Sequence, residues 1–334
     1  MKFGSVPVTE AEGVILAHAA GLPDGRIAKG TRLGRDELAR LASGGVATVI
    51  GAMLAEGDVP ENDAAAVLAQ ALAGGAVRVA PAATGRANLF AEENGLFLAD
   101  RQAVDRLNEI DPGITLATLP EYAPVTAGQM IATVKIIPLA LSGIAVARGL
   151  EAIGASPPLR VAAYRPARVA LVQTMLPGIK DSVLQKTKRS LDARLAPSSS
   201  SLVEEQRCAH DPDALRETLL RLRPAELVVI FGASAVIDRR DVIPAAIEDA
   251  GGAVHQFGMP VDPGNLLLFG TFRDNPILGA PGCARSPKEN GFDWVLNRLL
   301  AGVEVSPQDI RRMGVGGLLG EIPTRPSPRA LVGE

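Results

Sequence analysis

Aromatic side chains are scarce in this chain of 334 residues: they make up 3%, as eight Phe, two Tyr and one Trp. Proteins that bind single-stranded nucleic acid stack bases on aromatic side chains beside a basic groove. The formal net charge of −3 provides no chain-wide basic surface either. We therefore expect no nucleic-acid partner.

Cysteine and histidine are also rare, with two and three residues. Two distant cysteines, Cys208 and Cys283, are too few for a disulfide framework, as expected in a reducing cytoplasm. Cys208 and His210 lie two residues apart and could ligate a metal, but they leave a zinc site two ligands short. The favoured interpretation is that these side chains fill buried space.

Long hydrophobic runs are missing as well. The apolar run 13–22 follows Glu10 and Glu12 and has no basic lead, which is unlike a signal peptide. The run 130–147 contains Lys135 and Pro138 and falls short of the roughly 20 apolar residues of a membrane span. We expect a soluble, cytoplasmic protein with no membrane association.

What the chain has is ample apolar material, at 47% of residues, which predicts a globular protein with two or three domains. Ser156-Pro157-Pro158 interrupts a helical pattern and marks a plausible boundary. The predicted domains are a small α+β domain (1–78), a second small α/β or β-rich domain (79–160), an α/β/α domain (166–302), and a C-terminal helix with a tail (303–334).

Strand and helix patterns alternate from Arg168 onward. Asp211 precedes Pro212 as helix cap and first residue, and Gly251-Gly252 closes a later helix. The predicted strands are 169–172, 227–231, 253–255, 265–269 and 277–278, and the predicted helices include 180–195, 241–250 and 288–300. This alternation is typical of a parallel sheet covered on both faces.

Six segments of this domain carry motifs whose order is informative. They are Arg165–Thr174, Asp181-Ser182, Cys208–Arg216, Phe231–Asp241 with Gly-Ala-Ser at its turn, and two Pro-Gly turns in Met259–Asn265 and Gly279–Ser286. In this order they resemble the molybdopterin-binding domain shared by molybdopterin molybdenumtransferases (the MoeA and gephyrin E-domain proteins) and molybdopterin adenylyltransferases. Residues 27–46 also resemble the transferase segment that leads into this domain, although about 120 residues intervene here.

The resemblance implies a three-layer α/β/α fold, molybdopterin as ligand, and a role in molybdenum cofactor biosynthesis or delivery. The chain departs from the family where chemistry is expected. Ala233 and Ser234 replace paired glycines, and Met175, Leu176 and Pro177 replace an acidic motif. Both lysines of the basic turn are also replaced, by Asp262 and Asn265. These departures put molybdate insertion in doubt.

The residues that remain can still bind an anionic ligand. Backbone N–H groups at helix starts, hydroxyls and an arginine suit a phosphate, and Arg285 could hold it bidentately. The predicted ligand-binding residues are Thr174, Gly178, Lys180, Asp181, Ser182, Gly232, Ala233, Ser234, Pro263, Gly264, Pro281, Gly282, Arg285 and Ser286.

Two acids at the Phe231–Asp241 turn have separate interpretations. Asp241 is either a catalytic Mg²⁺ ligand or the N-cap of its own helix, whereas Asp238, between Ile237 and two arginines, is best interpreted as a surface ion-pair member.

Three functions remain open, and a homodimer is expected in each. The leading hypothesis is a protein that binds molybdopterin or its AMP or CMP form. The first alternative is a transferase that inserts molybdate or attaches a nucleotide with Mg²⁺. The second is a non-catalytic scaffold for a molybdoenzyme or nucleotidyltransferase.

Overall fold

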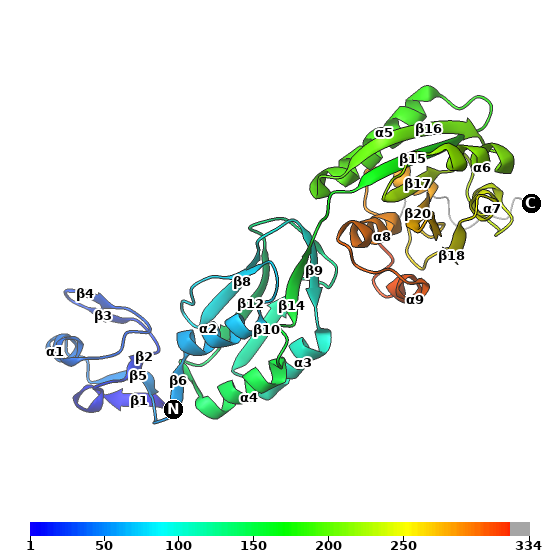
Figure 1. Ribbon diagram of the computed structural model, residues 1–334. Coiled ribbons are helices and arrows are strands. Elements are labelled where there is room, and N and C mark those ends of the chain that lie inside the picture. Colours follow the sequence, from blue (N-terminus) through cyan, green and yellow to red (C-terminus); the bar gives the residue numbers. More distant parts are fainter. Residues whose placement is uncertain (321–334) are drawn as a thin grey trace, which may run out of the picture. The chain divides into compact units, whose positions relative to one another are not determined.

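The computed structural model describes residues 1–320, which form two compact units (Figure 1). The first unit comprises residues 1–93 and 97–161, and the second comprises residues 94–96 and 162–320. The tail expected at 323–329 lies outside the described residues. The expected boundary near residue 78 stays a prediction.

The N-terminal part of the first unit is built on a small antiparallel sheet. Its order is β1-β5-β2, beside a hairpin of β3 and β4. Leu16, Leu33 and Leu41 are fully buried in its core. The element bounds are β1 (Lys2–Pro7), β2 (Ile15–Leu16), β3 (Ala20–Leu22), β4 (Gly25–Ile27), α1 (Arg35–Ser43) and β5 (Thr48–Met53).

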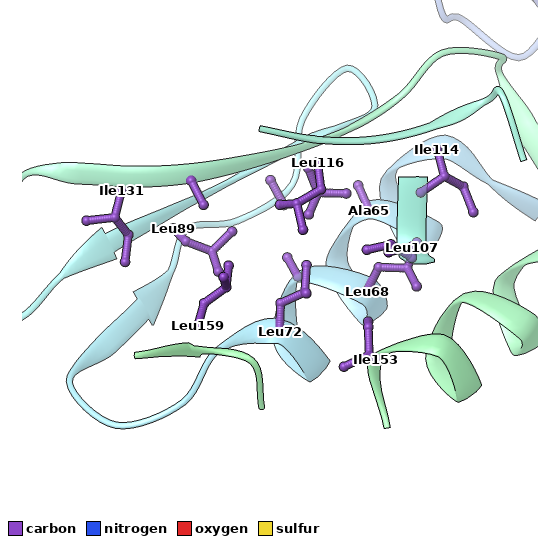
Figure 2. Packing of buried hydrophobic residues seen from close by; sticks show 14 of the residues in the cluster. Ala65, Leu68, Leu72, Leu89, Leu107, Ile114, Leu116, Ile131, Ile153 and Leu159 are labelled. Atoms are coloured by element: carbon purple, nitrogen blue, oxygen red, sulfur yellow. The ribbon is translucent and has the colours of Figure 1, made fainter. Parts of the chain in front are cut away.

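The rest of the first unit surrounds helix α2 (Glu61–Leu72). Leu68 and Leu72 of this helix lie among Leu89, Leu107 and Leu159 in one apolar cluster (Figure 2). The sheets have the orders β10-β12-β8-β7, β11-β9-β14 and β13-β6. The element bounds are β6 (Asp58–Pro60), β7 (Val77–Val79), β8 (Arg86–Ala91), β9 (Gly95–Ala99), α3 (Arg101–Ile110), β10 (Ile114–Thr118), β11 (Pro124–Val125), β12 (Met130–Ile136), β13 (Ala140–Ser142), α4 (Gly143–Ile153) and β14 (Leu159–Ala163).

The second unit contains a six-stranded sheet of order β16-β15-β17-β20-β19-β18. Strands β16, β15, β17 and β20 are parallel, and β19 is antiparallel to both its neighbours. The element bounds are β15 (Arg168–Met175), α5 (Asp181–Leu195), β16 (Ser201–Ala209), α6 (Pro212–Arg221), β17 (Leu227–Phe231), α7 (Val242–Asp249), β18 (Ala253–Phe257), β19 (Leu268–Phe272), β20 (Asn275–Ala280), α8 (Gly291–Leu300) and α9 (Pro307–Arg311).

Alternate residues of the central strands point to opposite faces of this sheet, as the two-residue strand period requires. Val169 and Leu171 pack with α5 and α8, whereas Ala170 and Val172 pack with α6 and α7. The predicted α/β class and the three-layer α/β/α arrangement are therefore confirmed.

Two sequence-based expectations about this sheet were wrong. The strand expected at 265–269 spans Leu268–Phe272, and it does not join a wholly parallel sheet. Arg273 and Asp274 both have positive φ, 50° and 62°, and form a two-residue turn from β19 into β20. Such a tight turn joins antiparallel neighbours, because a parallel connection needs a crossover of a dozen or more residues.

Candidate functional site

A pocket of about 120 Å³ lies where β17 and β20 end in the six-stranded sheet. We call it the strand-end pocket. Loops beyond the carboxyl ends of parallel strands are the usual ligand sites of such sheets. Of the predicted binding residues, six line it: Gly232, Ala233, Ser234, Pro281, Gly282 and Arg285.

Arg285 supplies the pocket's positive charge, and neutral groups hold its guanidinium in place. Nη1 donates to the Thr187 hydroxyl and, at 3.5 Å, to Oε1 of Gln173, while Nη2 donates to the Gly232 carbonyl at 3.0 Å. Within residues 1–320, no carboxylate oxygen lies within 4.0 Å of this guanidinium. Arg285 is thus a partly buried cation without an anionic partner in the described chain.

Burial lowers the pKa of Arg285, because removing water disfavours its charged form. A nearby anion acts in the opposite direction and favours the charged form. The electrostatics of the strand-end pocket therefore suit a ligand that brings negative charge to Arg285.

Thr174, at the end of β15, anchors one wall of the pocket. Its side chain is fully buried, and its Oγ1 accepts a hydrogen bond from the Ala233 N–H at 2.9 Å. The same oxygen lies 2.8 Å from Nδ1 of His210. Thr174 thus fixes the loop after β17 without lining the pocket.

A polar network continues from Gln173 behind Arg285 toward the exposed start of α5. Gln173 is fully buried, and its Nε2 donates to Glu205 Oε1 and to the Leu184 carbonyl, each at 3.1 Å. Arg207 bridges Glu205 at 2.7 Å and Asp181 at 2.6 Å. The network joins β15, β16 and α5.

Glu205 stays ionised within this network. Burial alone would raise its pKa, but the hydrogen bond and charge of Arg207, with help from Gln173 and Lys188, hold it below the ordinary value. Sequence reasoning missed Gln173, Thr187, Glu205 and His210 as part of the site. Single polar residues in strand and helix patterns carry no signal of such long-range contacts.

The remaining predicted binding residues do not line the strand-end pocket, and ligand contact by them stays a prediction. Lys180 is the N-cap of α5, Asp181 pairs with Arg207, and Gly178 adopts a positive φ of 86° in the preceding turn. Ser182 lies in the first turn of α5.

The turn that contains Pro263 and Gly264 packs on the start of α8. The Pro263 carbonyl accepts from the Gly291 N–H at 2.8 Å, and a Cβ at Gly264 would lie 2.5 Å from that nitrogen. Ser286 accepts from the Lys288 N–H at 3.3 Å.

Asp241 is the N-cap of α7. Its Oδ1 accepts from the Val242 N–H at 2.7 Å, and its Oδ2 accepts from the Ile237 N–H at 3.1 Å. Asp238 forms an exposed ion pair with Arg240 at 3.1 Å, as predicted. Over residues 1–320, no group of three or more His, Cys, Asp or Glu side chains could hold a metal ion. Use of Asp241 as a Mg²⁺ ligand or catalytic residue stays a prediction.

Cys208 lies half-buried against the apolar cluster under α6 and α7, and burial raises the pKa of its thiol.

In the described part of the chain, no helix is both long and apolar enough to cross a membrane.

No protein-family model and no curated protein matches the chain. Among solved structures, it is similar to a molybdopterin biosynthesis MoeA protein from Pyrococcus horikoshii, with 14% identity, 75% of this chain and 80% of that chain covered, and a TM-score of 0.28. It is also similar to a molybdenum cofactor biosynthesis protein from Pyrococcus furiosus, with 11% identity, 91% and 66% covered, and a TM-score of 0.24. TM-scores this low do not establish a shared fold, so the α/β assignment rests on the sheet and its covering helices.

Proposed function

We propose that the strand-end pocket binds the phosphate end of molybdopterin, or of its AMP or CMP form, and that this chain acts in molybdenum cofactor biosynthesis or delivery. The observation that carries the proposal is Arg285, a partly buried guanidinium with no carboxylate partner in the described chain. A phosphate would compensate its desolvation and accept hydrogen bonds from its remaining N–H groups.

The size of the pocket favours one end of a ligand over a whole pterin nucleotide. Sites that enclose an entire small molecule usually measure about 300–1,000 Å³, whereas the strand-end pocket measures about 120 Å³. The ring system would then lie outside it, along the loops after β15 and β17. Leu176 and Ile237 of these loops are 48% and 78% exposed and offer apolar surface there.

The ligand class comes from the six motifs of the 166–302 segment, which resemble a molybdopterin-binding domain. The same class of function is named for the solved structures to which the chain is similar. Binding or delivery is the activity we favour, because the described contacts of Asp241 are those of a helix cap, with each carboxylate oxygen accepting one backbone N–H bond. Transfer with Mg²⁺ is the alternative, and delivery would need a molybdoenzyme or nucleotidyltransferase as partner.

Small-molecule release from the purified protein tests the proposal. The full chain is expressed in a host that makes molybdopterin, and the acid-released compounds are identified by mass spectrometry. Wild type should release a pterin phosphate, with AMP or CMP if the nucleotide form is bound. Arg285→Ala should release much less pterin, because the loss of its charged hydrogen bonds should lower the affinity for the pterin phosphate roughly 10- to 150-fold.

Arg240→Ala is the matched control, because it removes the same positive charge. Arg240 is 93% exposed and lies outside the pocket, so this change should not affect ligand binding. Wild-type protein without any pterin, or equal pterin in the Arg285 and Arg240 variants, would contradict the proposal.

A further inference from the structure

The first unit contains a larger cavity, of about 480 Å³, whereas the motifs that suggested pterin binding belong to the second unit. We call it the N-terminal cavity. Its size is that of sites that enclose a whole small molecule. Its lining comes from several segments, including β1, the stretch after β4, the start of α2, and the connection from β12 to β13.

One side of the N-terminal cavity is apolar. Phe3 and Ile137 line it and are 62% and 59% exposed, although both are large hydrophobic residues. Leu139 forms part of the lining and is packed against Ala17 and Ala52 in a small buried cluster. The apolar side thus rests on packed residues and offers uncovered surface to a hydrophobic group.

The other side is basic. Lys135 donates to the Thr84 carbonyl at 2.8 Å and lies 3.5 Å from the Glu61 carboxylate, which neutralises its charge. Lys29 lines the cavity, is exposed, and has no carboxylate within 4.0 Å in residues 1–320. Met1 also lines the cavity, but its ammonium is paired with Asp58 at 2.6 Å. Lys29 is therefore the lining cation that no carboxylate of residues 1–320 neutralises, and His18 adds a further hydrogen-bonding group.

The Glu61–Lys135 pair is held by the turn that faces it. A Cβ at Gly85 would collide with both the Glu61 carboxylate and the Lys135 ammonium, and Gly85 has a φ of 68° that favours glycine. The Gly85 N–H donates to Asn62 at 2.8 Å, and its carbonyl accepts from Ile136 at 2.7 Å. Because Glu61 is tied to Lys135, the uncompensated charge is that of Lys29.

We propose that the N-terminal cavity binds a small amphipathic organic anion. Its apolar body lies on Phe3, Ile137 and Leu139, and its anionic group lies at Lys29. Concave shape, volume, apolar lining and a single unpaired cation are the features that select such a ligand. This site is independent of the strand-end pocket, which lies in the other unit.

Two fluorescent probes test this proposal on the full chain. They are the anion 1-anilinonaphthalene-8-sulfonate and its uncharged relative N-phenyl-1-naphthylamine, which shares the ring system. Wild type should bind both. Lys29→Glu should weaken the anionic probe about tenfold or more, as expected for reversing the charge at the binding group, and leave the neutral probe unchanged.

Arg26→Glu is the matched control, because Arg26 is an exposed cation of the neighbouring strand β4 that does not line the cavity. It should leave both probes unchanged. Ile137→Ser should weaken both probes about fivefold, through lost apolar contact. Ile137 is already largely exposed, so the fold should tolerate this change.

The alternative outcomes are distinct. Equal weakening by Lys29→Glu and Arg26→Glu would indicate only general surface charge and would overturn the proposal. Insensitivity of both probes to Ile137→Ser would overturn it as well. Loss of the anionic probe in Arg285→Ala would place that probe in the strand-end pocket, and this result too would overturn the assignment.

Discussion

The guanidinium of Arg285 lies over the ring of Phe231, with Cζ 5.2 Å from the ring centroid. Phe231 is the last residue of β17 and is almost fully buried between the sheet and α8. The ring face attracts the cation and leaves the guanidinium edge to make hydrogen bonds. A strand end thus orients the charged group on which the proposed function depends.

Anion binding at Arg285 should stabilise the folded protein. Inorganic phosphate that binds only the native state should raise the midpoint of thermal unfolding as its concentration increases. The increase should be absent in Arg285→Ala and retained in Arg240→Ala. Thermal scans over a phosphate series, with chloride at matched ionic strength, measure this. Equal increases in all three proteins would assign the effect to general salt action.

Substitutions at Asp241 distinguish a helix-capping role from metal binding. Asn is as good an N-cap as Asp, whereas Ala costs about 1 kcal/mol. Asp241→Asn can keep the bond from the Val242 N–H and loses only the exposed bond from the Ile237 N–H, so it should lower the free energy of unfolding less than Asp241→Ala, which should lower it by about 1 kcal/mol. Urea denaturation of both variants provides the values.

The same Asp241→Asn variant tests for Mg²⁺. A carboxylate repels an anionic ligand unless a divalent cation lies between them. If Asp241 is only a cap, calorimetric titration of the variant should show ligand binding and a response to Mg²⁺ like those of wild type. Loss of a wild-type Mg²⁺ response in Asp241→Asn would instead favour the transferase alternative.

The hydroxyl of Thr174 should stabilise the loop after β17 through its hydrogen bond with the Ala233 N–H. Thr174→Val keeps the side-chain shape but leaves the Ala233 N–H without its acceptor, which costs about 1–3 kcal/mol when the group cannot reach water. Amide hydrogen exchange at Ala233 should accelerate and stability should fall. Thr174→Ser retains the hydroxyl and is the control. Unchanged exchange at Ala233 in Thr174→Val would show that this bond does not hold the loop.

Glu205 should make the fold sensitive to acid. Its folded pKa lies below the ordinary value of 4.5, so its ionised form stabilises the native state above that value. This stabilisation disappears as the pH falls through the folded pKa. Wild type should exceed Glu205→Gln in stability at neutral pH, and the difference should shrink below about pH 4.5.

Chemical denaturation at a series of pH values checks this. Glu217→Gln is the control, because Glu217 forms an exposed pair with Arg221 and such pairs contribute little. A difference between wild type and Glu205→Gln that persists unchanged in acid would contradict the assigned role of Arg207 beside Glu205.

Local patterns predicted much of the second unit. The strand 227–231 has the predicted bounds, because a short unbroken run of apolar residues indicates a strand that is buried on both faces. Asp211 caps α6 through the Ala214 N–H at 3.0 Å, as the Asp-Pro pair indicated. These features depend on residues within a few positions of one another.

Local patterns did not predict whether a strand runs parallel or antiparallel to its neighbours. Arg273-Asp274 contains no glycine or asparagine, so the turn from β19 to β20 lacked its usual sequence signal. The order of strands then depends on which apolar faces pack against α5 to α8, a choice that involves the whole unit.

By itself, the sequence determined the α/β class, the helix caps and the loops that lie beyond the strand ends, since these follow from spacing, capping chemistry and burial of apolar runs. Only the tertiary structure decided that Arg285 contacts Thr187 and Gly232 with no carboxylate of residues 1–320 beside it, and that Lys29 and Phe3 line one cavity. The physical reason is that these contacts join residues far apart in the chain. Their geometry is set by packing of whole elements and has no local pattern to predict it.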